Sequence, residues 1–537
     1  MTSRSQFALR LVTASLFSIP LIWIIHKVGV NAPFQDELTF SNLYSQVISG
    51  ESLGLRELMS SHNGHPLLIP KLLMGLTLKF ELPWILLMYA QVALLFVAYL
   101  FATARLNDIK SLSDYCVLFG LAFSIFSARQ WENLYWAMQL AFPLYLALSF
   151  SAFFYAQRYW SSRRTSDLCV ALALALCAAT SNGAGIFTLI LTCIAVSLAR
   201  PNARDLTLSI AFAVSGTIFF ILSQSASTNG GIGASVPDLQ QFVRHAAQML
   251  ALTWLDFGEH KTVAEIFAVV FALVLVGTVV RTFKYRSLYT FELLSISIGL
   301  LVLLGVSYAR VSAGIFQPDA SRYIPLVIPI AVGSILIFRK SNWNFLLILA
   351  LLMSMSSYGL SYYREVRLAA ARHHNLEEAR IALCTNGKIH PAHNFSGAIQ
   401  PYTMENLQKL FCHTVSQIEH TNIDDSNSEG FSQEDSQTWI SPLFQAPIPQ
   451  PTPNTVVIRG WLPDISGYPD ERFSLSLFAN GKEIATTQLL TGGSFEIRAE
   501  LPQGSSVLRI ESTEKLKVSR DARALSWILG KVSFYPQ

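Results

Sequence analysis

Eleven long apolar segments constrain this chain more than any other feature of its sequence. A helix needs about 20 mostly apolar residues to cross the hydrocarbon core of a bilayer. The segments of about that length are residues 8–28, 84–104, 113–129, 140–157, 168–182, 184–199, 206–224, 263–281, 291–310, 323–338 and 344–362. The fifth and sixth are short and nearly continuous. We predict an α-helical polytopic membrane protein with about eleven spans.

Composition excludes several other classes of protein. Charged residues make up 14% of the 537 residues and hydrophobic residues 52%. A charged fraction this low and a hydrophobic fraction this high exclude a disordered chain, a nucleic-acid-binding domain and an ordinary cytosolic enzyme. The net charge of +4 is too small to imply a polyanionic partner, so we expect a lipid bilayer and no nucleic acid as partner. Residues 363–537 are richer in charge and read as a soluble tail.

Basic residues gather in alternate short loops. We read the first segment, with Arg4 and Arg10 before it, as an uncleaved anchor with a cytoplasmic N-terminus. The loops on that side then hold Arg4, Arg10, Arg105, Lys110, Arg158, Arg163, Arg164, Arg200, Arg204, Arg281, Lys284, Arg286, Arg339 and Lys340. This is the positive-inside pattern. It predicts the cytoplasmic (inner) membrane and an extracytoplasmic tail, periplasmic in a Gram-negative host.

The tail divides into two parts. Residues 363–437 read as a helical segment followed by an acidic linker, and five prolines lie within 442–453. Residues 438–537 alternate apolar and polar side chains, and the dipeptide Asn480-Gly481 among them predicts a hairpin turn. We predict an antiparallel β-sandwich there, either a carbohydrate-binding module or a structural lid. Residues 1–362 form the membrane domain.

Two of the six cysteines lie in the tail. On this topology Cys384 and Cys412 are in an oxidising compartment. They either form a disulfide or remain two buried free thiols.

The first long loop, residues 29–83, offers the first candidate chemistry. Asp36 and Glu37 precede a stripe of apolar residues over 40–48 that predicts a surface helix ending at Gly50. A carboxylate there could accept a proton from an acceptor hydroxyl. The alternative is a helix cap, because acids favour the first turn of a helix.

Two histidines follow in the same loop. His62 and His65 are three residues apart, and without a further ligand this spacing is weak evidence for a metal. We prefer a contact with phosphate or acceptor and predict no metal, although a divalent ion is not excluded. The alternative is a pair of interfacial hydrogen-bonding residues.

Three shorter segments on the same side add polar candidates. Arg129, Trp131, Glu132 and Gln139 crowd between two spans and could line a substrate; an interfacial aromatic belt would explain the aromatic residues alone. Asn182 interrupts two spans in a turn and is a further lining candidate. The other segment ends in Arg322, at the mouth of a span, which suits either a phosphate or a snorkelling role.

Taken together, these elements resemble the GT-C class of integral-membrane glycosyltransferases. The resemblance covers most of residues 1–362: an acidic residue early in the first loop (Asp36, Glu37), surface helices, about eleven spans, and a late basic residue (Arg322). The Asp-Glu pair is similar to that of protein O-mannosyltransferases. His62-Asn-Gly-His65 and Gln130-Trp-Glu-Asn133 look like segments of a bacterial group of such enzymes.

The resemblance implies sugar transfer from a polyprenyl-phosphate donor to an acceptor hydroxyl on a glycan, lipid or protein. Asp36 would be the general base, with Glu37 beside it. Arg322 would stabilise the departing phosphate, assisted by His62 or His65. Two other classes remain open: a glycan polymerase or ligase that uses a lipid-diphosphate donor, and a non-enzymatic transporter or scaffold for polysaccharide export.

Overall fold

A computed structural model describes most of the membrane region and the strands of the tail. The described residues are 3–50, 54–62, 64–106, 109–199, 201–225, 236–255, 260–284, 290–318, 320–340, 343–384, 411, 429–434, 437–448, 455–461, 473–489, 494–512 and 527–535. The chain divides into two compact units, Met1–Glu365 and Val366–Gln537. Each is treated by itself below.

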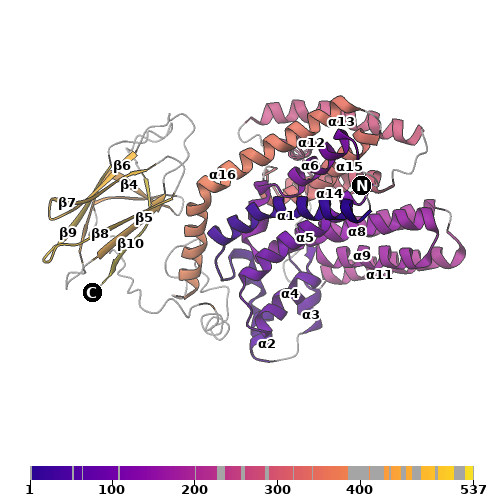
Figure 1. Cartoon of the computed structure of the whole chain (residues 1–537). Helices are drawn as coiled ribbons and strands as arrows, with labels where there is room; N and C mark the ends of the chain where they lie inside the picture. Colours follow the sequence, from indigo (N-terminus) through magenta and orange to yellow (C-terminus); the bar gives the residue numbers. More distant parts are fainter. Residues whose placement is uncertain are drawn as a thin grey trace. The chain divides into compact units, whose positions relative to one another are not determined.

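The first unit is helical, and every predicted span falls on a helix (Figure 1). The helices are α1 (Ser3–Val28), α5 (Ile85–Thr103), α6 (Leu112–Ile125), α8 (Ala141–Ser162), α9 (Thr165–Ser181), α10 (Gly185–Leu198), α11 (Ala203–Ser225), α13 (Lys261–Lys284), α14 (Thr290–Ser312), α15 (Ile324–Lys340) and α16 (Asn344–Cys384). In the described residues, nine segments are long and apolar enough to cross a membrane, while α9 and α10 are shorter apolar helices. These are the features of a multi-pass membrane protein.

Two helices form the centre of this unit. Almost all of α8 and α15 is buried, whereas α11 and α13 leave most of their apolar side chains exposed. Exposed apolar rows of this length are suited to lipid. Helix α15 packs closely on α14 because both carry glycine at the contact. A Cβ on Gly333 would lie 2.6 Å from the Glu292 carbonyl oxygen.

Ion pairs join the helix ends that the charge pattern places on the cytoplasmic side. The fully buried Glu292 carboxylate lies 2.5 Å from Lys340 Nζ, which links α14 to α15. The Arg339 Nε donates to Asp114 Oδ1 at 2.7 Å and links α15 to α6. Removing one partner of such a pair would leave a buried charge uncompensated.

The opposite ends of the helices carry the long connections, which we call the loop face. Its elements are η1 (Gln35–Phe40), α2 (Ser41–Ile48), α3 (Leu55–Met59), β1 (Ser61–His62), β2 (His65–Pro66), α4 (Leu68–Lys79), η2 (Ala128–Gln130), α7 (Trp131–Tyr135), η3 (Ala137–Leu140), α12 (Leu239–Ala251) and η4 (Ser321–Tyr323). Helices α2, α3 and α4 lie together (Figure 1). The predicted helix over 40–48 is confirmed as α2, and Gly50 follows it with φ +75°.

One segment of the loop face differs from the prediction. No element was predicted between the spans 206–224 and 263–281, but this stretch contains the amphipathic helix α12. Its buried side, including His245 and Met249, packs on α14, while Leu239 and Val243 are exposed. This helix was missed because its apolar residues follow the helical period over only three turns, within an otherwise polar stretch.

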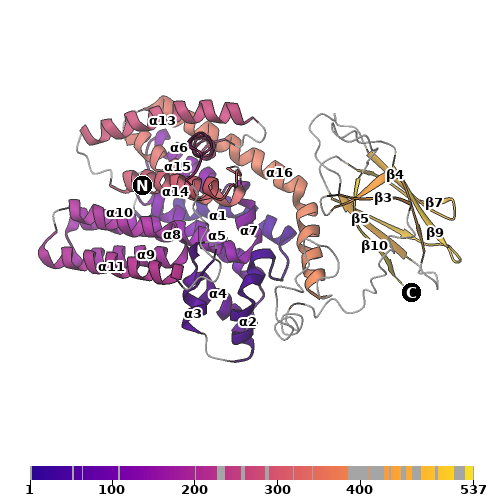
Figure 2. The same cartoon turned by 180° about the vertical axis from the view of Figure 1, so that it is seen from behind.

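Within its described residues, the second unit has eight antiparallel strands, most of which are labelled in Figure 2. They are β3 (Glu429–Glu434), β4 (Gln437–Pro447), β5 (Thr455–Trp461), β6 (Phe473–Ala479), β7 (Lys482–Leu489), β8 (Ser494–Glu500), β9 (Val507–Ser512) and β10 (Trp527–Tyr535). Strand β4 belongs to two arms, pairing with β9 in one and β10 in the other. Both arms contribute to one core, which includes Ile458, Leu477, Ile497 and Ile510.

The hairpin prediction for this unit is confirmed. Asn480 and Gly481 have φ +48° and +81° and connect β6 to β7, as a two-residue turn of this type requires. The linker prediction is wrong at Glu429–Glu434, because these residues form β3 and pair with β4. The Cys384 side chain, Cys412 and most of residues 385–428 of the predicted helical segment and linker lie outside the described residues.

Candidate functional site on the loop face

Segments far apart in the sequence meet on the loop face. The short helix α7 packs against η4, and η3 packs against η1, α4 and α5. The strand β2 packs against α9 and α11. The elements that carry the predicted site residues are therefore assembled into one region of the helical unit.

Among the described acidic groups of the first loop, the Glu37 carboxylate is the most enclosed. Its side chain has no exposed surface. Its Oε2 accepts from the Phe34 backbone N at 2.8 Å and from Trp84 Nε1 at 3.0 Å. Its Oε1 accepts from the Met138 backbone N at 2.8 Å. One carboxylate thus joins the first loop, the start of α5 and η3.

Burial dominates the titration of this group. Loss of water raises the pKa of Glu37 to about 7, against the opposing effect of the hydrogen bonds from Met138, Phe34 and Trp84. A carboxyl whose folded pKa is raised favours folding below its unfolded pKa and loses that contribution as the pH rises through the folded pKa. The full change for this shift is about 3 kcal/mol.

We therefore expect Glu37→Gln to flatten the pH dependence of stability. The melting temperature of the wild-type protein in detergent should fall between pH 5 and pH 8 more steeply than that of the variant, because glutamine cannot ionise. Glu81→Gln is the control, since Glu81 is exposed in the same loop. Parallel curves for wild type and Glu37→Gln would contradict the assignment.

The neighbouring Asp36 belongs to η1 through its backbone, but its side chain lies outside the described residues. Its predicted role as general base stays a prediction. The Glu37 hydrogen bonds nevertheless fix the turn of backbone that carries it.

A second feature of the loop face is a cluster that we call the basic corner: His65, Arg310, Arg322 and Tyr323. The two guanidinium groups each lie 5.7 Å from the centre of the Tyr323 ring. Three buried polar atoms of the corner have no hydrogen-bond partner within the described part of the chain, namely His65 Nδ1, Arg322 Nε and Tyr323 Oη. Buried polar groups without a partner in the chain are candidates for hydrogen bonds to a bound ligand.

His65 is neutral in this environment. Burial, then the nearby Arg310, then His62, lower its pKa to about 4. A neutral imidazole beside Arg310 can offer a hydrogen bond without adding charge. The corner therefore carries the charge of two guanidinium groups, with Glu132 as a neighbouring carboxylate.

Glu132 connects α7 to the basic corner. Its Oε2 accepts from the Arg322 backbone N at 3.0 Å, and its own backbone N donates to Ser321 Oγ at 3.1 Å. The reciprocal pair caps the start of η4 and holds Arg322 in place. The Glu132 side chain is only half-buried, so it is accessible to a ligand.

Gly183 is required for the position of His65. A Cβ at residue 183 would lie 2.7 Å from His65 Nδ1, closer than real Cβ contacts allow. The hairpin that carries His65 is also held by Gln224 Nε2, which donates to the Gly64 carbonyl at 2.8 Å. Because its hairpin is held in this way, the imidazole stays against Gly183, and a larger residue at 183 would have to push it out of place.

We expect Gly183→Ala to displace His65 and to reduce any activity that uses the basic corner by about tenfold, the effect of roughly 1.4 kcal/mol. The control is Gly277→Ala, because nothing lies within 4 Å of a Cβ there. Activity per folded protein is the measurement. Equal activity of the two variants would show that the His65 position is unimportant.

The remaining predicted residues have structural contacts. Asn182 is buried and its Oδ1 accepts from the Ala184 backbone N at 3.0 Å, which stabilises the turn into α10. Gln139 is buried in η3. The half-buried Trp131 lies beside Tyr135, with ring centres 6.0 Å apart. His62 is buried and its ring contacts Phe40 at 5.3 Å.

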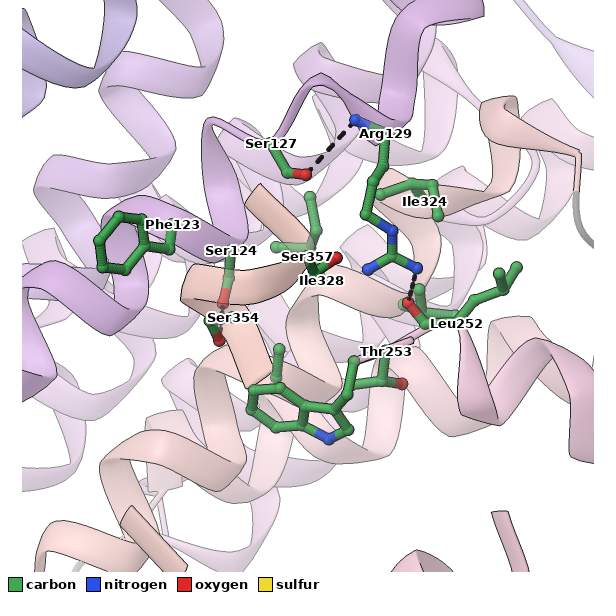
Figure 3. A pocket seen from close by; sticks show the side chains of 13 residues that line it. Phe123, Ser124, Ser127, Arg129, Leu252, Thr253, Ile324, Ile328, Ser354 and Ser357 are labelled. Carbon is green, nitrogen blue, oxygen red and sulfur yellow. Dashed lines mark hydrogen bonds between the residues drawn. The ribbon is translucent and has the colours of Figure 1, made fainter. Parts of the chain in front are cut away.

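Arg129 fastens α12 to the rest of the loop face. Its guanidinium donates to the carbonyl oxygen of Leu252 and, at 2.8 Å, to that of Leu255 (Figure 3). Beside it lies a cavity of about 10 Å³, onto which the hydroxyl-bearing Thr253 and Ser357 open. Such a cavity accommodates about one water molecule and no sugar or lipid phosphate. In this geometry the Arg129 guanidinium caps the C-terminal end of α12.

Sequence reasoning missed three residues of the loop face. Arg310 was assigned to the end of a span, Tyr323 to the start of another, and Lys71 to an apolar helix. The buried Lys71 Nζ donates to the Glu57 carbonyl at 2.6 Å and the Ser60 carbonyl at 2.7 Å. A signal existed for each: a polar or basic residue near the end of an otherwise apolar stretch.

The comparisons with known proteins add no assignment. No protein-family model matches the chain, and no curated protein matches its sequence. Among the described residues, no group of three or more His, Cys, Asp or Glu side chains could hold a metal ion. The case for a function therefore depends on the site itself.

Proposed function

We propose that this protein is a membrane glycosyltransferase of the GT-C type. It moves a sugar from a polyprenyl-phosphate donor to an acceptor hydroxyl at the extracytoplasmic face of the cytoplasmic membrane. The acceptor is part of a cell-surface glycan, a lipid or a protein. The loop face is the extracytoplasmic one on this proposal, and the helices with exposed apolar rows lie in lipid.

The observation that carries the proposal is the basic corner. Arg310 and Arg322 flank one tyrosine ring, and three buried polar atoms of the corner lack a partner among the described residues. Two guanidinium groups and a neutral imidazole match the charge and the hydrogen-bonding needs of a phosphate monoester. The corner lies at the end of apolar helices, where the headgroup of a lipid would be found.

The reaction needs a single displacement. Asp36 takes the proton of the acceptor hydroxyl, whose oxygen then attacks the anomeric carbon of the donor sugar. The bond between that carbon and the phosphate oxygen breaks, and its electron pair leaves with the polyprenyl phosphate. Arg310 and Arg322 stabilise the charge on the departing phosphate. One displacement inverts the anomeric centre.

Two neighbouring residues suit the sugar. The half-buried Trp131 offers an aromatic face, and the half-buried Glu132 offers a carboxylate beside Arg322. Aromatic faces and carboxylates are common partners of sugar rings and hydroxyls. In the second unit, the antiparallel strands suit a β-sandwich that binds or covers the glycan product.

A binding experiment separates this proposal from the use of a lipid-diphosphate donor. Purified protein in nanodiscs is titrated with undecaprenyl phosphate and with undecaprenyl diphosphate, and the melting temperature is followed. Greater stabilisation by the monophosphate, lost in Arg310→Ala, supports the proposal. Stabilisation by the diphosphate alone supports a polymerase or ligase, and stabilisation by neither favours a transporter or scaffold.

A further inference from the structure

The first acidic pair of the loop face has two members in very different surroundings. Glu37 has no exposed surface, and each of its carboxylate oxygens is already engaged by donors of this chain. A carboxylate in that condition has no free lone pair directed to solvent for an acceptor hydroxyl. Proton transfer requires contact of about 2.6–3.2 Å with the reacting group or one bridging water.

The partners of Glu37 come from three separate parts of the sequence. Phe34 belongs to the first loop, Trp84 to the residue before α5, and Met138 to η3. The Trp84 ring is itself held by the buried Tyr44, with ring centres 5.8 Å apart in an edge-on arrangement. Among the described acidic side chains of residues 29–83, Glu37 alone is fully buried.

We infer that Glu37 is a positioning residue: it clamps the turn that carries Asp36 against α5 and η3, so that the base is held at a fixed place relative to the basic corner. This inference rests on the proposed function, and it divides the Asp-Glu pair into a base and a clamp. A misplacement of about 1 Å in a catalytic group can cost about 100-fold in rate.

The clamp has consequences that a catalytic carboxylate would not have. Without the Glu37 carboxylate, the backbone amides of Phe34 and Met138 lose their acceptor. Their hydrogen exchange should then accelerate by at least about tenfold, the factor for about 1.4 kcal/mol of lost protection. The hydrogen-bond partners of Glu37 are Phe34, Trp84 and Met138, none of which belongs to the basic corner. A substitution of Glu37 should therefore leave phosphate binding at the corner unchanged.

The experiment compares wild type with Glu37→Gln, Asp36→Asn and the control Glu81→Gln in nanodiscs. Hydrogen exchange is followed by mass spectrometry in peptides that contain residues 33–40 and 136–140. Undecaprenyl phosphate serves as the binding probe, through its effect on the melting temperature. Transfer is measured in cells as the rate at which the sugar mass appears on surface glycan, per amount of folded protein.

The clamp predicts a distinct pattern for each variant. Glu37→Gln, whose side-chain amide keeps only one of the two acceptor oxygens, should show faster exchange in at least one of the two peptides, at least tenfold slower transfer and unchanged binding of the probe. Asp36→Asn should lose transfer with unchanged exchange, and Glu81→Gln should match wild type in all three. A Glu37→Gln protein that loses transfer with normal exchange would show direct catalysis by Glu37 and overturn the clamp.

Failure of the proposed function looks different from failure of the clamp. If the wild-type protein adds no sugar, the glycosyltransferase proposal fails, while the exchange data still test whether Glu37 holds the three segments together. If the wild-type protein adds sugar and Glu37→Gln transfers and exchanges at the wild-type rate, the clamp alone is wrong.

Discussion

Asp36→Asn is expected to leave a folded, membrane-inserted protein that transfers sugar about 10²–10⁴-fold more slowly, the usual contribution of a general base. The substitution keeps the size of the side chain and removes its ability to accept a proton. Transfer per amount of inserted protein is the measurement, with the melting temperature as a check on folding.

This variant also tests the capping alternative. Asn caps a helix about as well as Asp does, so a capping role predicts nearly unchanged behaviour. The matched control is Asp238→Asn, because Asp238 is a plain cap whose Oδ1 accepts from the Gln241 backbone N at 2.7 Å. Equal activity of the two variants would show that Asp36 serves only the structure of η1 and performs no chemistry.

The second large effect on the rate of sugar transfer is expected when either arginine of the basic corner is replaced. Arg310→Ala and Arg322→Ala should each reduce transfer by about 10²–10³-fold, as expected for a group that stabilises developing charge in an enclosed site. The Arg310→Ala/Arg322→Ala double variant should lose less than the product of the two single effects, because both residues act on one phosphate.

The arginine variants have a binding readout that does not depend on catalysis. Both should weaken the stabilisation by undecaprenyl phosphate in nanodiscs. Arg204→Ala is the control, since Arg204 is exposed and lies near the start of α11, away from the loop-face end of that helix. If the arginine variants bind the lipid and transfer sugar as the control does, the corner is a membrane-interface anchor.

The helices of this protein were predictable because their signal is local. A run of apolar residues determines where a spanning helix lies, and each predicted span falls on a helix. The Asn480-Gly481 turn is equally local, since only residues that accept positive φ fit it. Helix α12 was missed because its apolar residues follow the helical period over only three turns, and strand β3 because its extended conformation depends on pairing with β4.

The candidate site was predictable in its residue types and less so in their arrangement. Arg322 and His65 were identified from sequence, but Arg310 is far from His65 along the chain and is brought close to it by α14. The difference between Asp36 and its neighbour Glu37 was also invisible, because the partners Trp84 and Met138 come from other segments.

The measurement that tests the central claim most directly is a comparison of surface glycans by mass spectrometry. The host strain that lacks this gene is complemented with wild type or with Asp36→Asn at matched membrane levels. The proposed function predicts that wild type restores a fixed increment in mass, equal to one sugar class, and that Asp36→Asn does not. Equal glycans in all three strains would contradict glycosyl transfer by this protein.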